Sequence, residues 1–161
     1  MKEHERKQYL DLLRKYDNYN CFEFPKDFDR YDRSQLEDRK SFTLAFEKLT
    51  NLSFKFTPVQ DASHYGSLVN KDANHSFFIS LRFSSFGRLV ALTTRYSSED
   101  RRFFADFQRL PFTENEIANL LGQHNFRYVP LDVLYLPYDG VNTNLKNLDG
   151  YYWWNRYFDY I

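Results

Sequence analysis

The sequence predicts one α+β domain, residues 1–161, in which helices cover mainly one face of an antiparallel sheet. The first supporting observation is at residues 76–96, where two runs of alternating apolar residues flank Gly87, as in a β-hairpin. The second is that residues 2–16 and 34–49 carry apolar side chains at the spacing of amphipathic helices. A hairpin is marginal in water on its own, so we expect the helices to bury its apolar face.

The composition limits the kind of protein this is. The chain is long enough to bury a hydrophobic core, and 20% of its residues are aromatic. Lys and Arg number 22 together, as do Asp and Glu, so the zero net charge favours neither nucleic acid nor an anionic membrane as a partner. Cys21 is the only cysteine, which excludes an intramolecular disulfide and a cysteine-based zinc site. The charged N-terminus has no signal-peptide core, and no window approaches the ~18 apolar residues of a membrane helix, so we expect a cytoplasmic protein.

Two helices and one strand are expected before the hairpin. Ser34 and Glu37 fit a capping box at the start of the second helix. Residues 52–59 alternate between apolar and polar side chains, which predicts a strand, and residues 60–74 are expected to be a loop with a short strand at 67–69. The side chains that we expect the second helix to bury are Leu36, Phe42, Ala45, Phe46 and Leu49.

The segment 97–110 is ambiguous between helix and strand. Its first four residues resemble the start of a helix, and a buried stripe of phenylalanines would follow on one helical face. Residues 102–107 also fit a strand, because aromatic residues are common there. We favour the helix. The three residues of the stripe are Phe103, Phe104 and Phe107.

The following segment is easier to interpret. Thr113 and Glu116 fit a second capping box, and the helix that they begin is expected to end near Gly122. Residues 126–129 then predict a short strand that stops at Pro130, and one helical turn is expected directly after it.

The sequence contains little that indicates catalysis. The four histidines are too far apart in sequence to form a metal-binding pair, and the glycines never form a phosphate-binding loop, so we expect neither a metal nor a cofactor. His64 has Asp61 nearby and Asp72 further along, which leaves a small hydrolase or nuclease as an alternative function. Catalysis of that kind depends on tertiary geometry, and a polar loop explains the same residues more simply.

A nucleic-acid-binding module is a further alternative. Arginines and aromatic residues on the hairpin would form a sheet face that stacks bases and contacts phosphates. Aromatic residues at alternating strand positions usually belong to the core, so we expect no nucleic acid as partner. The residues of this hypothetical face are Arg82, Phe86, Arg88, Arg95 and Tyr96.

The C-terminal segment, residues 131–161, has the most unusual composition of the chain. It contains eight tyrosine or tryptophan residues together with several aspartates. Trp153, Tyr157 and Phe158 are expected to dock this segment on the sheet, while other aromatic residues remain exposed. Exposed tyrosine and tryptophan provide contact area with a polar group, as in binding hot spots.

Several of these segments together resemble small bacterial immunity proteins, the antidotes encoded beside polymorphic toxins such as those of contact-dependent growth inhibition. The resemblance extends from about residue 76 to the C-terminus and consists of the phenylalanine-rich hairpin followed by residues 126–134, 138–140 and 153–161. It implies a cytoplasmic protein without cofactor or enzymatic activity. Such a protein binds the C-terminal domain of its cognate toxin and masks the toxin's active site. We expect a monomer or a homodimer.

The resemblance also implies the character of the binding surface. Many toxin domains are nucleases with basic clefts, so an acidic, tyrosine-rich surface is expected to bind them. The candidate toxin-binding residues are Asp132, Tyr135, Tyr138, Asp139 and Asp159. An alternative binding loop at residues 18–32 carries acidic residues among aromatic ones, namely Glu23, Asp27, Asp29 and Asp32.

Overall fold

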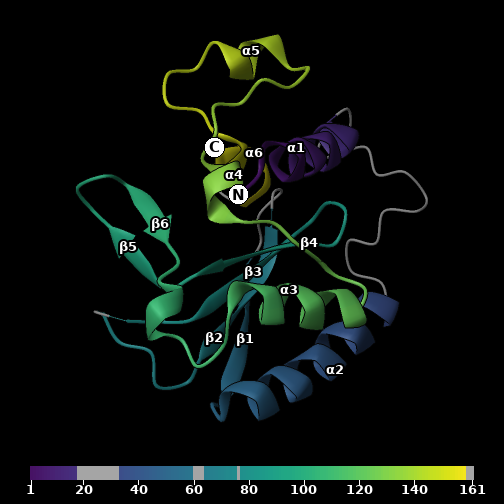
Figure 1. Cartoon of the computed structure of the whole chain (residues 1–161), viewed down its shortest axis with the longest axis vertical. Coiled ribbons are helices and arrows are strands. Elements are labelled where there is room, and N and C mark those ends of the chain that lie inside the picture. Colours follow the sequence, from purple (N-terminus) through teal and green to yellow (C-terminus); the bar gives the residue numbers. More distant parts are fainter. Residues whose placement is uncertain (18–32, 60–63, 76, 159–161) are drawn as a thin grey trace.

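Five strands form a central sheet in the order β1-β2-β3-β4-β7 in the computed structural model, which describes residues 1–17, 33–59, 64–75 and 77–158 (Figure 1). Neighbouring strands are antiparallel except β7, which runs parallel to β4. The α+β class is therefore confirmed, although the sheet is mixed. The parallel pair arises because a helix carries the chain back across the sheet before β7. The strands are β1 (Phe54–Pro58), β2 (His64–Asn70), β3 (Ser80–Ser84), β4 (Leu89–Thr93) and β7 (Arg127–Tyr128).

The predicted central hairpin is formed by β3 and β4. Leu81 lies opposite Leu92 and Phe83 opposite Val90. Gly87 in the connecting turn has a φ of +63°, and a Cβ there would lie 2.6 Å from the ring of Tyr16. Glycine is required at this position for both its backbone conformation and its small size.

Helices cover both faces of the sheet, where the sequence analysis expected them mainly on one. The first core lies under α2 (Arg33–Thr50) and α3 (Glu114–Gln123), and the second lies under α1 (Glu3–Asp17), α4 (Leu131–Leu134) and α6 (Trp153–Phe158). Both faces need a cover because β4 carries apolar side chains on both of its sides. Val90 and Leu92 face the first core, while Leu89 and Ala91 face the second.

Only some of the α2 side chains that were predicted to be buried lie in the first core. Phe42 and Phe46 are buried and stacked, with ring centroids 5.4 Å apart. Leu36 and Leu49 are each 37% exposed, so their predicted burial is wrong. Gln35, next to Leu36, is buried instead at 2% exposure.

The segment after β4 forms a second hairpin, so the helix favoured for residues 97–110 is wrong. Strands β5 (Arg95–Ser97) and β6 (Arg102–Phe104) pair antiparallel and project beside the sheet, and a short 3₁₀ helix, η1 (Phe107–Arg109), follows (Figure 1). The backbone amide of Thr94 donates to the carbonyl of Phe104 (2.7 Å). The amide of Phe103 donates to the hydroxyl of Tyr135 (2.8 Å). These contacts hold β6 extended.

The segment leading into β7 follows the prediction closely. Thr113 and Glu116 form the capping box of α3, with the amide of Glu116 donating to Thr113 Oγ1 (3.2 Å) and the amide of Thr113 donating to Glu116 Oε2 (2.7 Å). Helix α3 ends at Gln123, and α4 begins directly after Pro130. Strand β2 is longer than the short strand predicted at residues 67–69.

The C-terminal segment docks on the second core as predicted, with Trp153, Tyr157 and Phe158 fully buried in α6. Before α6, a loop carrying α5 (Thr143–Lys146) projects from the molecule, and its two ends meet where the amide of Tyr138 donates to the carbonyl of Tyr151 (3.0 Å).

The base of this loop is fixed by Asp17 at the end of α1. The Asp17 carboxylate is 1% exposed and accepts hydrogen bonds from the Tyr138 hydroxyl (2.7 Å), the Val141 amide (2.7 Å) and Arg156 Nε (3.1 Å). Helix α1 is therefore tied to the loop and to α6 at one point. Over the described ranges of the chain, no helix is long and apolar enough to cross a membrane.

Candidate functional site

An open groove lies between α1, α3, α4 and the segment that joins β6 to η1. It consists of an inner cavity of about 370 Å³ and an outer cavity of about 690 Å³, which share Glu114, Tyr128 and Asp132 as lining residues. We call this surface the acidic groove. Cavities of this size are typical of binding sites.

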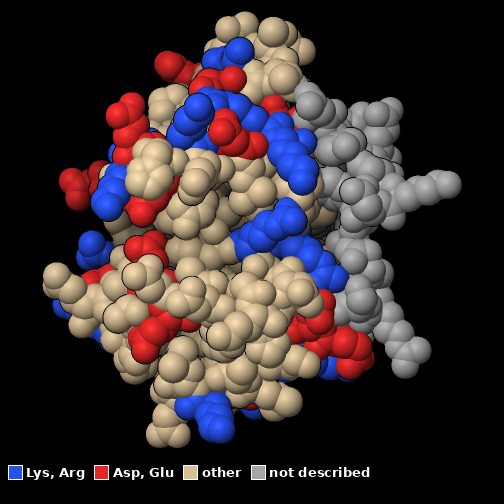
Figure 2. Space-filling model, turned by 45° about the vertical axis from the view of Figure 1, so that its right-hand side comes forward, with Lys and Arg blue, Asp and Glu red and all other residues tan. Residues whose placement is uncertain are grey.

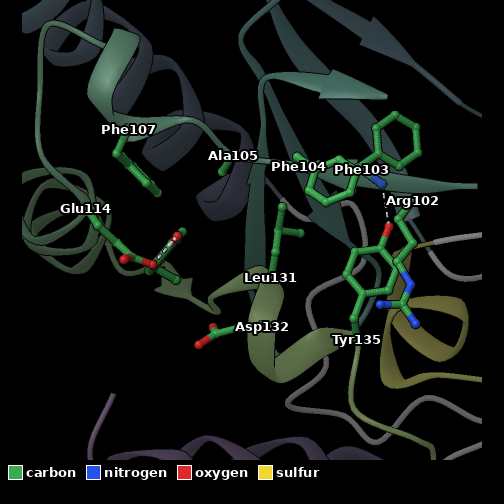
Figure 3. Close-up of a pocket in the computed structure, with 10 residues that line it drawn as sticks. Arg102, Phe103, Phe104, Ala105, Phe107, Glu114, Leu131, Asp132 and Tyr135 are labelled. Atoms are coloured by element: carbon green, nitrogen blue, oxygen red, sulfur yellow. Dashed lines mark hydrogen bonds between the residues drawn. The ribbon is translucent and has the colours of Figure 1, made fainter. Parts of the chain in front are cut away.

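The walls of the inner cavity are mainly apolar and aromatic. Phe107 lies on one side, Phe104 and Tyr135 lie on the other, and Leu131 lies between them (Figure 3). The outer cavity continues along α1, where Tyr9 and other α1 side chains line it. The groove thus combines large apolar contact area with polar groups, as binding hot spots do.

Carboxylates stand at the rim because three helices begin there. Glu114 is the first residue of α3, Asp132 is the second residue of α4, and Glu5 is in the first turn of α1. Acidic residues are favoured in the first turn of a helix, where the backbone amides are unpaired. Local helix formation therefore explains why these residues are acidic, and the tertiary fold explains why they meet.

The carboxylates of the groove influence the pKa values of two nearby tyrosines, Tyr128 and Tyr9. The hydroxyl of Tyr128 donates to Glu114 Oε1 (2.8 Å), and burial followed by this carboxylate raises the pKa of Tyr128 well above its usual value. Burial also raises the pKa of Tyr9, and Glu114, Glu5 and Asp132 raise it further. Both phenols stay protonated at neutral pH, and Tyr128 holds the Glu114 carboxylate at the cavity.

Within the described ranges, neither Glu114 nor Asp132 forms an ion pair with a lysine or arginine. Elsewhere the charges of the protein are interspersed, with basic groups beside acidic ones over the face shown in Figure 2. Arg102 lines the far end of the inner cavity, but its guanidinium turns away, donates to the Tyr152 hydroxyl (2.8 Å) and lies over the ring of Tyr135 (Figure 3). Among the described residues, the charges of Glu114 and Asp132 are therefore not neutralised by an ion pair, although Arg102 and Met1 also line the groove.

The structure brings together two of the five predicted toxin-binding residues. Asp132 and Tyr135 both line the inner cavity. Tyr138 is only 5% exposed and bonds to Asp17, so it lies in the interior, and Asp139 is exposed but paired with Arg14 on α1 (2.7 Å). The remaining predicted residues lie outside the described residues; they are Asp159 and the alternative loop residues Glu23, Asp27, Asp29 and Asp32.

Sequence reasoning missed the residues that come from distant elements. Glu114 was read only as part of the helix that Thr113 caps, and Phe107 as part of a helical stripe. Tyr128 and Asp132 are close in sequence, on either side of Pro130 at the turn from β7 to α4, so their proximity could have been predicted. The crossover from α3 through β7 to α4 brings Glu114, Tyr128 and Asp132 to the same cavity, and η1, which precedes α3, adds Phe107.

The hydrolase alternative loses one of its two acid–base pairs. His64 begins β2 and is buried, whereas Asp72 follows the far end of that strand, where its Oδ1 accepts a hydrogen bond from Asn70 Nδ2 (3.0 Å). A seven-residue strand spans roughly 20 Å, so His64 and Asp72 are too far apart to exchange a proton. Asp61 lies outside the described residues. In the part of the chain that the structure describes, no group of three or more His, Cys, Asp or Glu side chains could hold a metal ion.

The sheet face proposed for nucleic-acid binding is covered. Phe86 is fully buried in the second core, and the guanidinium of Arg82 lies over the ring of Phe103 (4.3 Å) beneath α6. Arg88 forms an ion pair with Asp38 (2.6 Å). Arg95 and Tyr96 remain exposed, but both lie on the separate β5–β6 hairpin. The structure therefore offers no open sheet face built from these described residues.

Comparisons of the chain with protein-family models, with curated proteins and with solved structures find no match. The chemistry of the acidic groove is therefore the basis on which a function is assigned.

Proposed function

We propose that this is an immunity protein that binds a cognate bacterial toxin domain and masks its active site, without catalysis of its own. The observation that carries the proposal is the acidic groove, in which Glu114 and Asp132 lie beside aromatic walls and form no ion pair with a described lysine or arginine. The resemblance of residues 76 onward to immunity proteins agrees with it. A toxin domain with a basic cleft is the complementary partner, because opposite potentials speed association and exclude wrong partners.

The groove is also held in one conformation, which a tight inhibitor requires. Tyr128 fixes the carboxylate of Glu114, and the hydroxyl of Tyr135 accepts from the amide of Phe103. The ring of Tyr135 stacks on Trp154 with centroids 5.7 Å apart. A surface ordered before binding loses less conformational entropy when the partner arrives.

Under this proposal the protein acts in the cytoplasm, where it meets the toxin. The edge strand β1 favours a monomer over a homodimer formed through the sheet. Exposed Lys55 is the second residue of this strand, and Pro58, which lacks an amide proton, ends it. Lysine and proline on an edge strand oppose pairing with a second chain.

Co-expression with the product of the neighbouring upstream gene tests the proposal. We expect the two proteins to remain together in size-exclusion chromatography, and cells expressing the neighbour alone to stop growing. The association rate should fall as salt is raised, because screening weakens the electrostatic attraction. A neighbour that neither arrests growth nor binds this protein would refute the immunity function.

A further inference from the structure

The inner cavity of the acidic groove has two carboxylates facing one space. Glu114 and Asp132 line it from different elements, with Phe107 near Glu114 and Leu131 near Asp132 (Figure 3). Glu114 accepts one hydrogen bond from Tyr128, and Asp132 Oδ1 accepts one from the amide of Val133 (3.1 Å). An ionised carboxylate has about four acceptor positions, so each retains capacity for a donor that enters the cavity.

The lining of the cavity selects among cations. Calcium and magnesium take six or more oxygen ligands, whereas this cavity offers two carboxylates, and its other walls are mainly apolar or aromatic apart from Arg102, whose guanidinium points away. An apolar and aromatic lining suits an organic cation that carries its charge on a hydrocarbon stem. The occupant is therefore expected to be a side chain.

Arginine fits this lining better than lysine. Its guanidinium is planar, has five donors that satisfy two carboxylates at once, and stacks on aromatic rings. The protein uses the same chemistry for its own arginines: Arg39 lies over the ring of Phe56 (3.5 Å), and Arg102 lies over that of Tyr152 (4.7 Å). A volume of about 370 Å³ accommodates an entire arginine side chain with its flanking backbone.

We propose that the inner cavity is the receptor for an arginine side chain of the partner protein, whose guanidinium binds between Glu114 and Asp132 beside Phe107. Identifying that partner as the toxin domain rests on the function proposed above, while the arginine site itself stands on the cavity. In the adjoining outer cavity, burial raises the pKa of Tyr9, and the charges of Glu114, Glu5 and Asp132 raise it further, which agrees with a surface that favours positive charge.

A peptide titration of the full-length protein tests the site directly. The probe is acetyl-Gly-Arg-Gly-amide, followed by amide chemical shifts, with matched peptides that carry citrulline or lysine in place of arginine. We expect the largest shifts at Phe107, Leu131 and Asp132, and binding at least about tenfold weaker for citrulline, which has the same shape without the charge. Equal binding of citrulline, tighter binding of lysine, or shifts spread outside the groove would each overturn the assignment.

Near-isosteric variants test the two carboxylates. Glu114→Gln and Asp132→Asn should each weaken arginine-peptide binding several-fold, and the double variant at least about tenfold. Asp149→Asn is the matched control, because Asp149 is exposed in the α5 loop outside both cavities of the groove and its loss changes the net charge equally. If Asp149→Asn weakens binding as much, the effect is one of overall charge and the site is refuted. The comparison of arginine with citrulline on the unmodified protein decides the matter if a variant does not fold.

Measurements on the complex separate this inference from the function. If the neighbouring toxin binds the double variant as tightly as it binds the unmodified protein, the arginine site is refuted and the immunity function stands. If the neighbour does not bind at all while the arginine peptide does, the immunity function fails and the arginine site stands.

Discussion

Replacing Asp17 with alanine is the most informative test of how the two ends of the structure are held together. The substitution removes the acceptor for the Tyr138 hydroxyl, the Val141 amide and Arg156 Nε in one step. Side-chain exposure is 1% for Asp17 and 13% for Arg156, so water does not readily replace the lost carboxylate. Removing one partner of a buried ion pair costs roughly 3–5 kcal/mol.

Orphaned neutral donors add roughly 1–3 kcal/mol each, but these contributions overlap with the loss of the ion pair. We therefore expect Asp17→Ala to lower the free energy of unfolding by about 4 kcal/mol. That is a large part of the roughly 5–15 kcal/mol that stabilises a typical domain. The measurement is urea unfolding followed by tryptophan fluorescence, since Trp153 and Trp154 lie in the same core.

The matched control is Asp139→Ala, which also removes an aspartate paired with an arginine. Asp139 pairs at 2.7 Å with Arg14, which lies on α1 as Asp17 does, but the side chains of Asp139 and Arg14 are 53% and 41% exposed. Exposed pairs contribute about 0–1 kcal/mol, so we expect the control to change the free energy of unfolding by less than about 1 kcal/mol. Equal losses for Asp17→Ala and Asp139→Ala would show that burial does not set the strength of these contacts and would refute the reasoning.

Three further substitutions or conditions probe other parts of the fold. Gly140→Ala should destabilise the protein by about 1–3 kcal/mol, because the new Cβ would overlap Asp17 Oδ2 and the Tyr138 hydroxyl. Gly122→Ala should be neutral or stabilising, because a Cβ at that position of α3 meets open space, and thermal unfolding compares the two variants. Thr113→Ala should cost about 1 kcal/mol by removing the capping box of α3, and an unchanged melting temperature would mean that this cap contributes nothing. Burial, the leading cause for each, raises the pKa values of Tyr128, Tyr138 and Tyr157 in the folded state. The folded protein therefore holds more protons on these tyrosines than the unfolded chain above the usual tyrosine pKa of about 10, so their contribution to stability should be constant below that pH and fall above it. Ionisation of these three tyrosines at about pH 10 while the protein is still folded, followed by tyrosinate absorbance, would contradict this expectation.

The fold was predictable wherever local periodicity determines structure. Helix α1, helix α3 and the β3–β4 hairpin each carry a complete pattern in consecutive residues. The β5–β6 hairpin carries no such pattern, because Phe103 is held by Tyr135 and Trp154, which lie later in the chain. The burial of both sheet faces was visible in the unbroken apolar run of β4, which is typical of a strand covered on two sides.

The candidate site was predictable only in part for the same reason. Composition indicated Asp132 and Tyr135, which share one short segment, but Glu114 and Tyr9 reach the groove through tertiary contacts. Composition also cannot distinguish an exposed tyrosine from a buried one. Tyr138 is buried because its hydroxyl meets Asp17, 121 positions earlier in the chain.

The attachment of α6 to α1 has a consequence for the order in which the protein is made. The Tyr157 hydroxyl donates to the carbonyl of Leu13, 144 positions earlier, and Arg156 reaches Asp17 across 139 positions. During translation, α1 leaves the ribosome long before the helix that covers it, and closing so long a loop slows folding. The first core needs no residue beyond Tyr128, so it can assemble while α1 and the opposite sheet face still wait for their cover. A cell that depends on this protein therefore gains it only after residues 153–158 have been synthesised, and a chain interrupted earlier would expose its second core to aggregation and proteolysis.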